Sequence, residues 1–410
     1  MHFAKCRFCG KKLTVTFTDL GITPLSNSFI SLKNLYRSEV FYPLHAMVCE
    51  ECLLVQVIDV QTPKEIFSEY AYFSSYSDSW LNHAKEYAQM IISKLMLGRD
   101  SNVIEIASND GYLLQYCNEY DILVLGIEPA ANVAACAAKK GVPTIVDFFG
   151  VGLANKLAKG GQFADLIIGN NVLAHVPDIN DFVEGMRRIL APGGTITLEF
   201  PHLLKLIEGN QFDTIYHEHF SYISLLAAIK IFKAHDLCIY DVEEIPTHGG
   251  SLRIYVGHFS DTYKKVSSAV DKVLSDEINR GLNSINVYKL FAENVKRIKY
   301  SILELLISLK QDGKVIVGYG APAKGNTLLN YCGIRTDFIS FTVDRNPYKQ
   351  GKYLPGTHIP ILDPDKIKET KPEYVFVMPW NIKDEIIQQL EFIREWGGKF
   401  IIPIPEIEVI

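Results

Sequence analysis

The stretch Val103–Leu114, VIEIASNDGYLL, decides the fold. An apolar, β-branched run ends in a polar turn containing Gly111, and the apolar start of a helix follows at once. Further strands, separated by helical segments, are predicted within ILVLGIEPA (122–130), TIVDFF (144–149), ADLIIGNNVLAHV (164–176) and TITLEF (195–200). This alternation predicts an α/β fold with a parallel, doubly wound sheet, in which ligands bind beyond the carboxyl ends of the strands.

Residues at these predicted strand ends suit a nucleotide-like ligand. Gly111 lacks a Cβ where a ligand could press on the backbone, and Glu105 could bind a cationic or hydroxylated group. Glu128 follows about 20 residues later, as expected of an acceptor for ribose hydroxyls. Asp147 and Phe148 offer an acceptor and an apolar contact for adenine. A nicotinamide dinucleotide and a ligand-free structural turn remain alternatives, although the turn has no basic patch for a pyrophosphate.

The N-terminal region carries two C-x-x-C pairs, Cys6 with Cys9 and Cys49 with Cys52. This spacing lets both sulfurs of one turn face a tetrahedral zinc ion. A unit of about 65 residues has a small core and usually needs such a staple. A redox role and four unrelated buried cysteines are the alternatives. We therefore predict a closed, structural four-thiolate zinc site in a domain spanning residues 1–68.

The remaining chain divides into two further predicted domains. An amphipathic helix over about residues 79–97 leads into the doubly wound domain, assigned to residues 69–245. From about Pro246 the pattern restarts with a strand, long helices over about 260–309 and a second α/β unit, which we assign to a Rossmann-like domain over residues 246–410.

Charge and hydrophobicity argue against nucleic-acid and membrane partners. The net charge is −6, without a basic tract, which argues against a nucleic-acid partner. No apolar run approaches the roughly 20 residues of a membrane span, and the N-terminus has no signal-like apolar core. We expect a cytoplasmic protein without a membrane partner, as a monomer or weak homo-oligomer.

The order of the motifs resembles one family over nearly the whole chain, the bacterial sugar-nucleotide C-methyltransferases. The matching motifs are the two cysteine pairs, EYAYFSSYS (69–77), EIASNDGYLL (105–114), NNVLAHVPD (170–178), YHEHFSY (216–222), HGGSLR (248–253) and GYGAPAKGN (318–326). The resemblance implies an N-terminal zinc domain, a central class I S-adenosylmethionine domain and a C-terminal Rossmann-like domain, with the sugar nucleotide between the last two. In the methyltransferase pattern E/D-x-G-x-G-x-G, Ala107 and Asn109 replace the first two glycines.

Such enzymes methylate a carbon beside the keto group of a nucleotide-linked 4-keto-6-deoxyhexose. This chemistry needs a base at the C–H bond, donors at the ketone oxygen and close positioning of the methyl group. By resemblance, His219 is the base at carbon 3, Glu218 positions or tunes it, Tyr216 hydrogen-bonds the substrate, and His175 faces the cofactor and the ketone. A tyrosine closes the site, with Tyr70 or Tyr72 preferred over Tyr76.

Further contacts follow from the resemblance. It implies cofactor contacts from Ala107, Asn109 and Asn170, and substrate contacts from Tyr222, His248, Arg253, Lys324 and Asn326. Lys324 also stands beside a glycine turn at a predicted helix start, which suits a diphosphate, unless the turn is only structural. The HEH triplet lacks the H-E-x-x-H spacing of a zinc site, so we expect His217 to be structural or on the surface.

The preferred activity is methylation of carbon 3, with dTDP as the preferred nucleotide. The alternatives are methylation at carbon 5, methylation at oxygen or nitrogen, and a zinc-containing interaction protein with an inactive methyltransferase domain.

Overall fold

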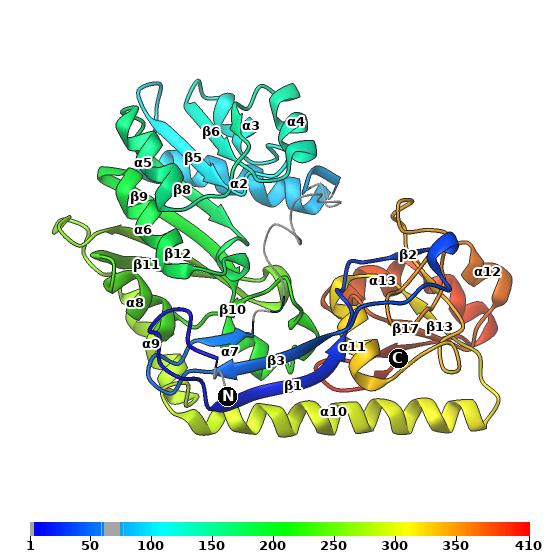
Figure 1. The fold of residues 1–410 in the computed structure, drawn as a ribbon. Coiled ribbons are helices and arrows are strands. Elements are labelled where there is room, and N and C mark those ends of the chain that lie inside the picture. The colour runs from blue at the N-terminus through cyan, green and yellow to red at the C-terminus, as the bar shows by residue number, and fades with distance from the viewer. Residues whose placement is uncertain (1–3, 59, 61–73, 77) are drawn as a thin grey trace.

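The computed structural model describes residues 4–58, 60, 74–76 and 78–410 (Figure 1). Its central sheet has seven strands in the order β11-β12-β9-β8-β5-β6-β7. The strands are β5 (Asn102–Ile106), β6 (Leu123–Ile127), β7 (Thr144–Ile145), β8 (Ala164–Asn170), β9 (Leu190–Pro201), β11 (Leu237–Ile245) and β12 (Ser251–His258). Strands β5 to β9 are parallel, which confirms the predicted doubly wound sheet.

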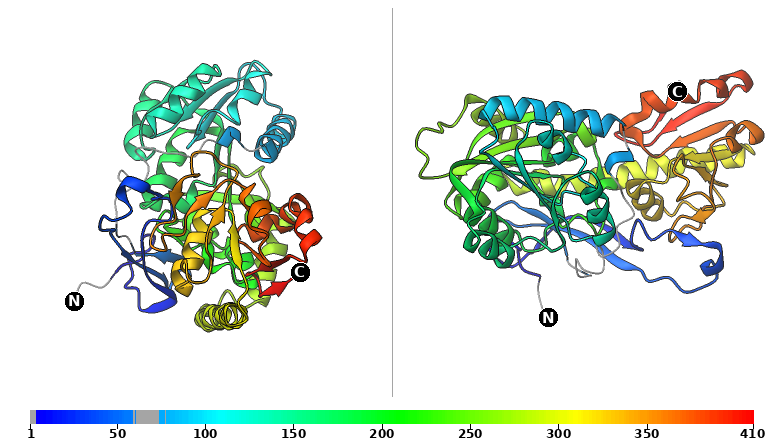
Figure 2. Two further views of the ribbon diagram at one scale, coloured as in Figure 1. Left: turned by 90° about the vertical axis from the view of Figure 1, so that its right-hand side faces the viewer. Right: turned by 90° about the horizontal axis from the view of Figure 1, so that it is seen from above.

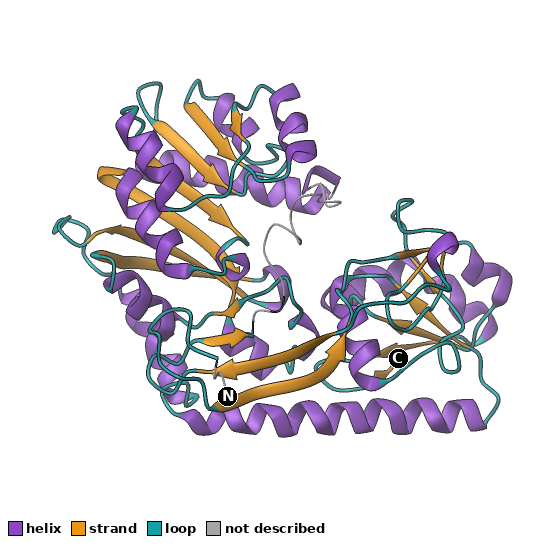
Figure 3. Cartoon of the chain, in the orientation of Figure 1, coloured by secondary structure: helices purple, strands orange, loops and turns teal. Residues whose placement is uncertain are grey.

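Helices cover both faces of this sheet (Figure 3). They are α2 (Asp78–Leu95), α3 (Leu114–Asn118), α4 (Ala131–Lys139), α5 (Val151–Lys159), α6 (Ile179–Ile189) and α8 (Leu225–Lys233). Helix α7 (Leu203–Glu208) instead packs into the core shared by the N-terminal sheet and the C-terminal lobe. Strands β5 and β8 are therefore buried almost throughout, as their continuous apolar runs require. The chain order reverses between β5 and β8, and ligands of such sheets bind at this point.

Strand β12 lies in the central sheet, although it follows the predicted domain boundary at residue 246. It runs antiparallel between β9 and β11, and the hairpin with β11 extends from the Leu237–His258 pair to the Ile245–Ser251 pair. The connecting turn contains Gly249 and Gly250 at positive φ. These turn residues interrupt the apolar pattern at the place where the sequence suggested a boundary.

The N-terminal sheet has the order β1-β3-β4-β10 and is antiparallel. Strands β1 (Val15–Thr23), β3 (Tyr42–Val48) and β4 (Val55–Val57) come from the N-terminal region. The fourth strand, β10 (Ser221–Tyr222), belongs to the YHEHFSY motif. The N-terminal unit is thus completed by the segment in which we predicted the catalytic residues.

The C-terminal sheet has the order β16-β14-β13-β17-β18-β19. Its strands are β13 (Ile316–Tyr319), β14 (Thr342–Val343), β16 (Ile361–Leu362), β17 (Tyr374–Val377), β18 (Lys399–Ile402) and β19 (Glu408–Val409), packed with α11 (Ala323–Cys332), α12 (Lys366–Thr370) and α13 (Lys383–Gln389). A two-stranded ribbon of β2 (Ile30–Ser31) and β15 (Lys352–Tyr353) joins this lobe to the N-terminal region. All but β19 pair in parallel, so this lobe is a second α/β unit, as expected.

Helix α10 (Ile285–Gln311) follows α9 (Ser268–Asn279) and runs along the base of the molecule, beneath both lobes (Figures 1 and 2). Its 27 residues span about 40 Å. The buried side chains form one stripe at helical spacing: Tyr288, Phe291, Val295, Ile298, Ile302, Leu306 and Leu309. Phe291 stacks on Phe17 of β1 with 4.4 Å between ring centroids, so the helix ties the N-terminal sheet to the C-terminal core. Within the described residues, no helix is both long and apolar enough to cross a membrane.

Candidate functional site

The turn after β5 adopts the backbone that the glycine pattern predicts. Ala107, Asn109 and Gly111 have φ values of 58°, 49° and 74°. These are the three pattern positions, and each lies in the left-handed region that favours glycine. The turn therefore keeps the shape of a glycine-rich cofactor loop, although two of its three positions carry a side chain.

Glu128 at the end of β6 supports this turn. Its carboxylate accepts the backbone N–H of Asn109 at 3.0 Å and that of Ala130 at 2.9 Å. Each oxygen keeps a second lone pair, which can accept a ribose hydroxyl. Asp147 and Phe148 are exposed just beyond β7, where they can meet the base. The chemistry of these residues suits an adenosine moiety.

Two predicted cofactor residues are buried more deeply. Glu105 is only 1% exposed, and burial raises the pKa of its carboxyl group well above the usual value. Glu105 stays a predicted cofactor contact, and its deep burial favours the neutral form of the carboxyl group. Asn170, at the end of β8, is 8% exposed, and neither polar atom of its side chain has a hydrogen-bond partner among the described residues. Such an orphaned amide suits a ligand that supplies its partner.

Gly111 provides a test of the turn. A Cβ at this position would lie 3.1 Å from Val142 Cγ2 and 3.2 Å from Ala137 Cβ. Gly141 has a similar φ of 77°, but a Cβ there would meet nothing within 4 Å. We expect Gly111→Ala to lower the free energy of unfolding by roughly 2–3 kcal/mol and to weaken S-adenosylmethionine binding at least tenfold.

Gly141→Ala is the matched control, because it carries the backbone cost of roughly 1 kcal/mol without the steric clash. Urea unfolding and calorimetric titration measure both effects. Equal losses in the two variants would contradict the close packing assigned to Gly111.

A cluster of aromatic and imidazole rings lies beyond the carboxyl end of β8. His175 ends the short helix η3 (Leu173–His175), and its ring centroid lies 4.7 Å from that of His219. The Tyr216 ring lies 4.0 Å from the His219 ring on another side, and Tyr222 of β10 lies 6.1 Å away. The structure thus brings together the predicted base and three of its predicted neighbours.

Backbone carbonyls fix the protonation of both imidazoles. His219 Nδ1 lies 2.9 Å from the Thr214 carbonyl oxygen, and His175 Nδ1 lies 2.7 Å from that of Glu218. Because a carbonyl only accepts, each Nδ1 must carry the proton. The lone pair of each neutral ring is then on Nε2. His219 is consequently held in the tautomer that a general base requires.

Burial also keeps both rings neutral. It lowers the pKa of His175 to about 4, and burial together with the neighbouring His175 lowers the pKa of His219 well below its usual range. Both imidazoles should therefore be unprotonated at pH 6, where an ordinary histidine with a pKa of about 6.5 is mostly charged.

NMR titration can check this. With ¹³C-labelled histidine, we expect the Cε1–H resonances of His175 and His219 to stay unshifted between pH 8 and 5.5, while exposed histidines titrate. The two signals are assigned by their loss in His175→Gln and His219→Gln. A midpoint near 6.5 for either signal would contradict the assigned burial effect.

Glu218 and His217 face the N-terminal region. Glu218 is buried and accepts a hydrogen bond from Asn27 Nδ2 at 2.7 Å; burial raises its pKa, and this hydrogen bond opposes the shift. His217 is also buried, and its Nε2 lies 3.1 Å from the Pro43 carbonyl oxygen, with the Tyr42 ring packed edge-on. His217 is therefore structural, whereas Glu218 stands beside the imidazole pair.

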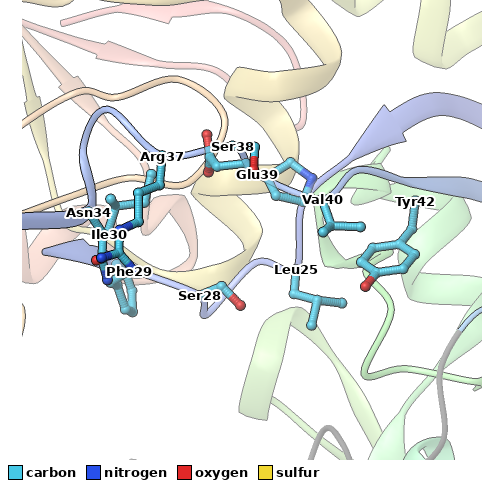
Figure 4. Close-up of a pocket in the computed structure, with 11 residues that line it drawn as sticks. Leu25, Ser28, Phe29, Ile30, Asn34, Arg37, Ser38, Glu39, Val40 and Tyr42 are labelled. Carbon is cyan, nitrogen blue, oxygen red and sulfur yellow. The ribbon is translucent and has the colours of Figure 1, made fainter.

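A pocket of about 350 Å³ adjoins this region (Figure 4). It is formed by the segment of residues 24–42 and is lined by both apolar and polar side chains, among them Phe29, Arg37 and Tyr42. Tyr42 separates it from His217. The pocket therefore reaches the ring that packs on His217, and none of His175, Tyr216, His219 and Tyr222 lines it.

The C-terminal lobe brings Lys324 toward the same region. Lys324 stands in the first turn of α11, and its charge lowers the pKa of His248, adding to the larger effect of burial. His248 Nε2 lies 3.1 Å from Asn171 Nδ2 at the carboxyl end of β8. Asn326, in the same helix, is fully buried, and neither side-chain polar atom has a hydrogen-bond partner among the described residues.

Arg253, a predicted substrate contact, forms ion pairs within the central lobe. It lies on β12 at 5% exposure and donates to Glu199 at 3.2 Å and to Glu243 at 2.9 Å, with its guanidinium over the Tyr87 ring. These contacts make it a structural ion pair inside the central lobe. Tyr70 and Tyr72 lie outside the described residues, and only the backbone of Tyr76, in η2 (Ser74–Tyr76), is described.

The four N-terminal cysteines converge as predicted. Their sulfur atoms all lie within 4.8 Å of one another, with 3.5 Å between Cys6 and Cys52 and between Cys9 and Cys49. A tetrahedral zinc with Zn–S bonds of about 2.3 Å needs sulfurs about 3.8 Å apart, so the set fits this ion. Gly10 and Leu53, each directly after a pair, have φ values of 71° and 65°, which turns both loops toward the centre.

Comparison with known proteins finds three successive domains in this chain. Three family models match in succession: a zinc binding domain over residues 6–67, a methyltransferase domain over 80–242 and a C-methyltransferase C-terminal domain over 246–405. The C-methyltransferase NovU of Streptomyces niveus is 35% identical over 406 residues, covering 99% of this chain and 96% of its own. The chain belongs to the C-methyltransferase family.

This C-methyltransferase depends on S-adenosylmethionine and carries the four-cysteine zinc site. Among solved structures, a methyltransferase from Clostridium acetobutylicum is 10% identical, with a TM-score of 0.35, over 43% of this chain and 92% of its own. One from Anabaena variabilis is 14% identical, with a TM-score of 0.34, over 42% and 83%.

Sequence reasoning missed several residues around the site of this C-methyltransferase. Asn27, Asn171, Asp213 and Trp380 contact predicted site residues or their immediate neighbours. Asn171 belongs to the motif NNVLAHVPD and Asp213 lies three residues before YHEHFSY, so their places in the sequence could have indicated them. Asn27 and Trp380 come from other domains, and no local pattern marks them.

Proposed function

We propose that this C-methyltransferase methylates carbon 3 of a nucleotide-linked 4-keto-6-deoxy sugar, with dTDP as the preferred nucleotide, through an enolate formed by His219. The observation that carries the proposal is the Nδ1–H to carbonyl bond of His219, because it leaves Nε2 as a base in a dry cluster. Bound S-adenosylmethionine would supply an electrophilic methyl group.

The surrounding residues support enolate formation. His219 Nε2 takes the proton from the carbon beside the ketone, and the imidazolium that results is stabilised by the Thr214 carbonyl and by the enolate charge. Tyr216 carries the hydroxyl that can donate to the enolate oxygen. A neutral His175 can only accept at Nε2, so we assign it to a sugar hydroxyl, and the predicted donation to the ketone falls to Tyr216.

The nucleotide end of the substrate is assigned to the C-terminal lobe. Lys324 and the N–H groups that begin α11 suit a diphosphate, because a helix N-terminus favours anions. His248 belongs to the central lobe, and the charge of Lys324 lowers the pKa of its imidazole. The proposal is consistent with the similarity to NovU, a C-methyltransferase that is 35% identical over 406 residues.

Solvent isotope exchange tests the reaction class. Incubated in D₂O with a panel of nucleotide 4-keto sugars and without S-adenosylmethionine, the enzyme should introduce deuterium beside the ketone. With S-adenosylmethionine, NMR of the product should place the methyl group on carbon 3. A methyl group on carbon 5, oxygen or nitrogen would replace the proposal, and absence of both exchange and cofactor binding would favour an inactive interaction protein.

A further inference from the structure

Asp213 is fully buried three residues before the YHEHFSY motif (216–222), and the proposed mechanism gives it no role. It lies in the short helix η4 (Phe212–Thr214), and its Oδ2 accepts the indole N–H of Trp380 at 2.7 Å. Trp380 begins η6 (Trp380–Ile382) in the C-terminal lobe, 167 residues away in sequence. This hydrogen bond links the C-terminal lobe directly to the segment that leads into the base.

The residue after Asp213 orients the base. The Thr214 carbonyl accepts the Nδ1–H of His219 at 2.9 Å and the hydroxyl of Tyr222 at 3.5 Å. Helix η4 has only three residues, so an anchor on Asp213 restricts the peptide group that carries this carbonyl. Any rotation of η4 would move the oxygen that fixes the tautomer and direction of the His219 ring.

Burial disfavours the charged form of the Asp213 carboxyl group. Its Oδ1 has no hydrogen-bond partner among the described residues, and burial raises the pKa of the carboxyl group to about 6, against the opposing charge of Lys324. The Lys324 ammonium lies 4.6 Å from the centre of the Trp380 ring. A series of contacts thus runs from Lys324 of α11 to Trp380 and on to Asp213. The next residue, Thr214, carries the carbonyl that binds the His219 imidazole.

We propose that Asp213 and Trp380 are positioning residues, through which the C-terminal lobe holds the Thr214 carbonyl and thereby the His219 imidazole in the orientation of a base. The inference rests on the proposed function, because it takes His219 as that base. It gives the C-terminal lobe a part in the chemical step besides the binding of the nucleotide.

Trp380→Phe is the deciding variant, because it removes the N–H donor and keeps an aromatic ring under Lys324. Trp396→Phe is the matched control: its indole N–H donates to the Pro372 carbonyl at 2.9 Å in the same lobe. We expect Trp380→Phe to lower kcat for exchange about tenfold, with KM for the sugar nucleotide within twofold. Trp396→Phe should change neither constant.

Substitutions at Asp213 provide a rescue. Asp213→Asn keeps an acceptor for the indole and should retain kcat within threefold. Asp213→Ala removes the acceptor, so its kcat for exchange should fall as far as that of Trp380→Phe. The double variant, Asp213→Ala with Trp380→Phe, should be no slower than either single variant, because both remove one interaction. Circular dichroism and S-adenosylmethionine binding confirm that each variant is folded.

A readout independent of turnover separates this inference from the proposed function. The ¹⁵N NMR resonance of His219 Nδ1–H should shift in Trp380→Phe and stay unchanged in Trp396→Phe. If the wild type shows no exchange but this shift occurs, the proposed function fails and the positioning stands. A wild-type kcat and an unshifted resonance in Trp380→Phe, or an equal loss in Trp396→Phe, would overturn the positioning role.

Discussion

Replacing His219 by alanine should lower both isotope exchange and methyl transfer by about 10³-fold and leave S-adenosylmethionine binding unchanged. Proton abstraction by a positioned side chain contributes on the order of 10²–10⁴ in rate. His219 is the imidazole whose Nδ1–H is bound to the Thr214 carbonyl and whose ring packs between Tyr216 and His175. Alanine removes the proposed base, and the substituted position is distant in sequence from the turn after β5.

The measurements are initial rates of deuterium incorporation, methyl transfer by mass spectrometry and calorimetric titration of the cofactor. His235→Ala is a suitable control, because His235 contacts Asn180 and Glu184 of α6, away from the site. Exchange at the wild-type rate in His219→Ala would remove His219 from the mechanism and direct attention to Glu218, whose pKa is raised.

Cys49→Ser should release the zinc ion, unfold the N-terminal sheet and abolish activity. Structural zinc contributes roughly 10–16 kcal/mol of binding energy in zinc-finger peptides, and a four-thiolate site that loses one ligand loses much of it. Strand β4 follows the Cys49–Cys52 loop and pairs with β10, which begins two residues after His219. Loss of the metal is therefore expected to disturb the base across the domain boundary.

Zinc content by mass spectrometry and thermal unfolding measure this effect. Cys238→Ser is the control, because Cys238 is a half-buried thiol on β11, outside the four-cysteine cluster. It should keep its zinc and its melting temperature within a few degrees. An unchanged zinc content in Cys49→Ser would rule out the four-thiolate site.

Local patterns in the sequence predicted much of this architecture. Apolar runs separated by turns located β5 to β9, and the C-x-x-C spacing located the metal site. The glycine pattern located a turn whose three special positions all have positive φ, even where Ala107 and Asn109 stand. In each case the physical determinant lies within a few consecutive residues, so it is visible without a fold.

The remaining features depend on contacts between distant segments. The pairing of β10 with β4, the Asn27–Glu218 hydrogen bond and the Asp213–Trp380 hydrogen bond join residues separated by more than 160 positions. The ion pair of Arg253 with Glu199, a buried acid on β9, likewise joins two separate strands. Periodicity carries no information on such pairs.

The interleaving of the domains limits how this enzyme can be recombined with its relatives. A chimera joined at residue 246 would divide the hairpin of β11 and β12 between two parents. A chimera that exchanges the N-terminal region would pair β10 and β15 with strands from the other parent. It would also replace Phe17, the ring on which Phe291 of α10 stacks. Viable hybrids should therefore inherit these strand pairs and the Phe17–Phe291 contact together, so that crossover points follow the spatial interfaces and not the linear order of the domains.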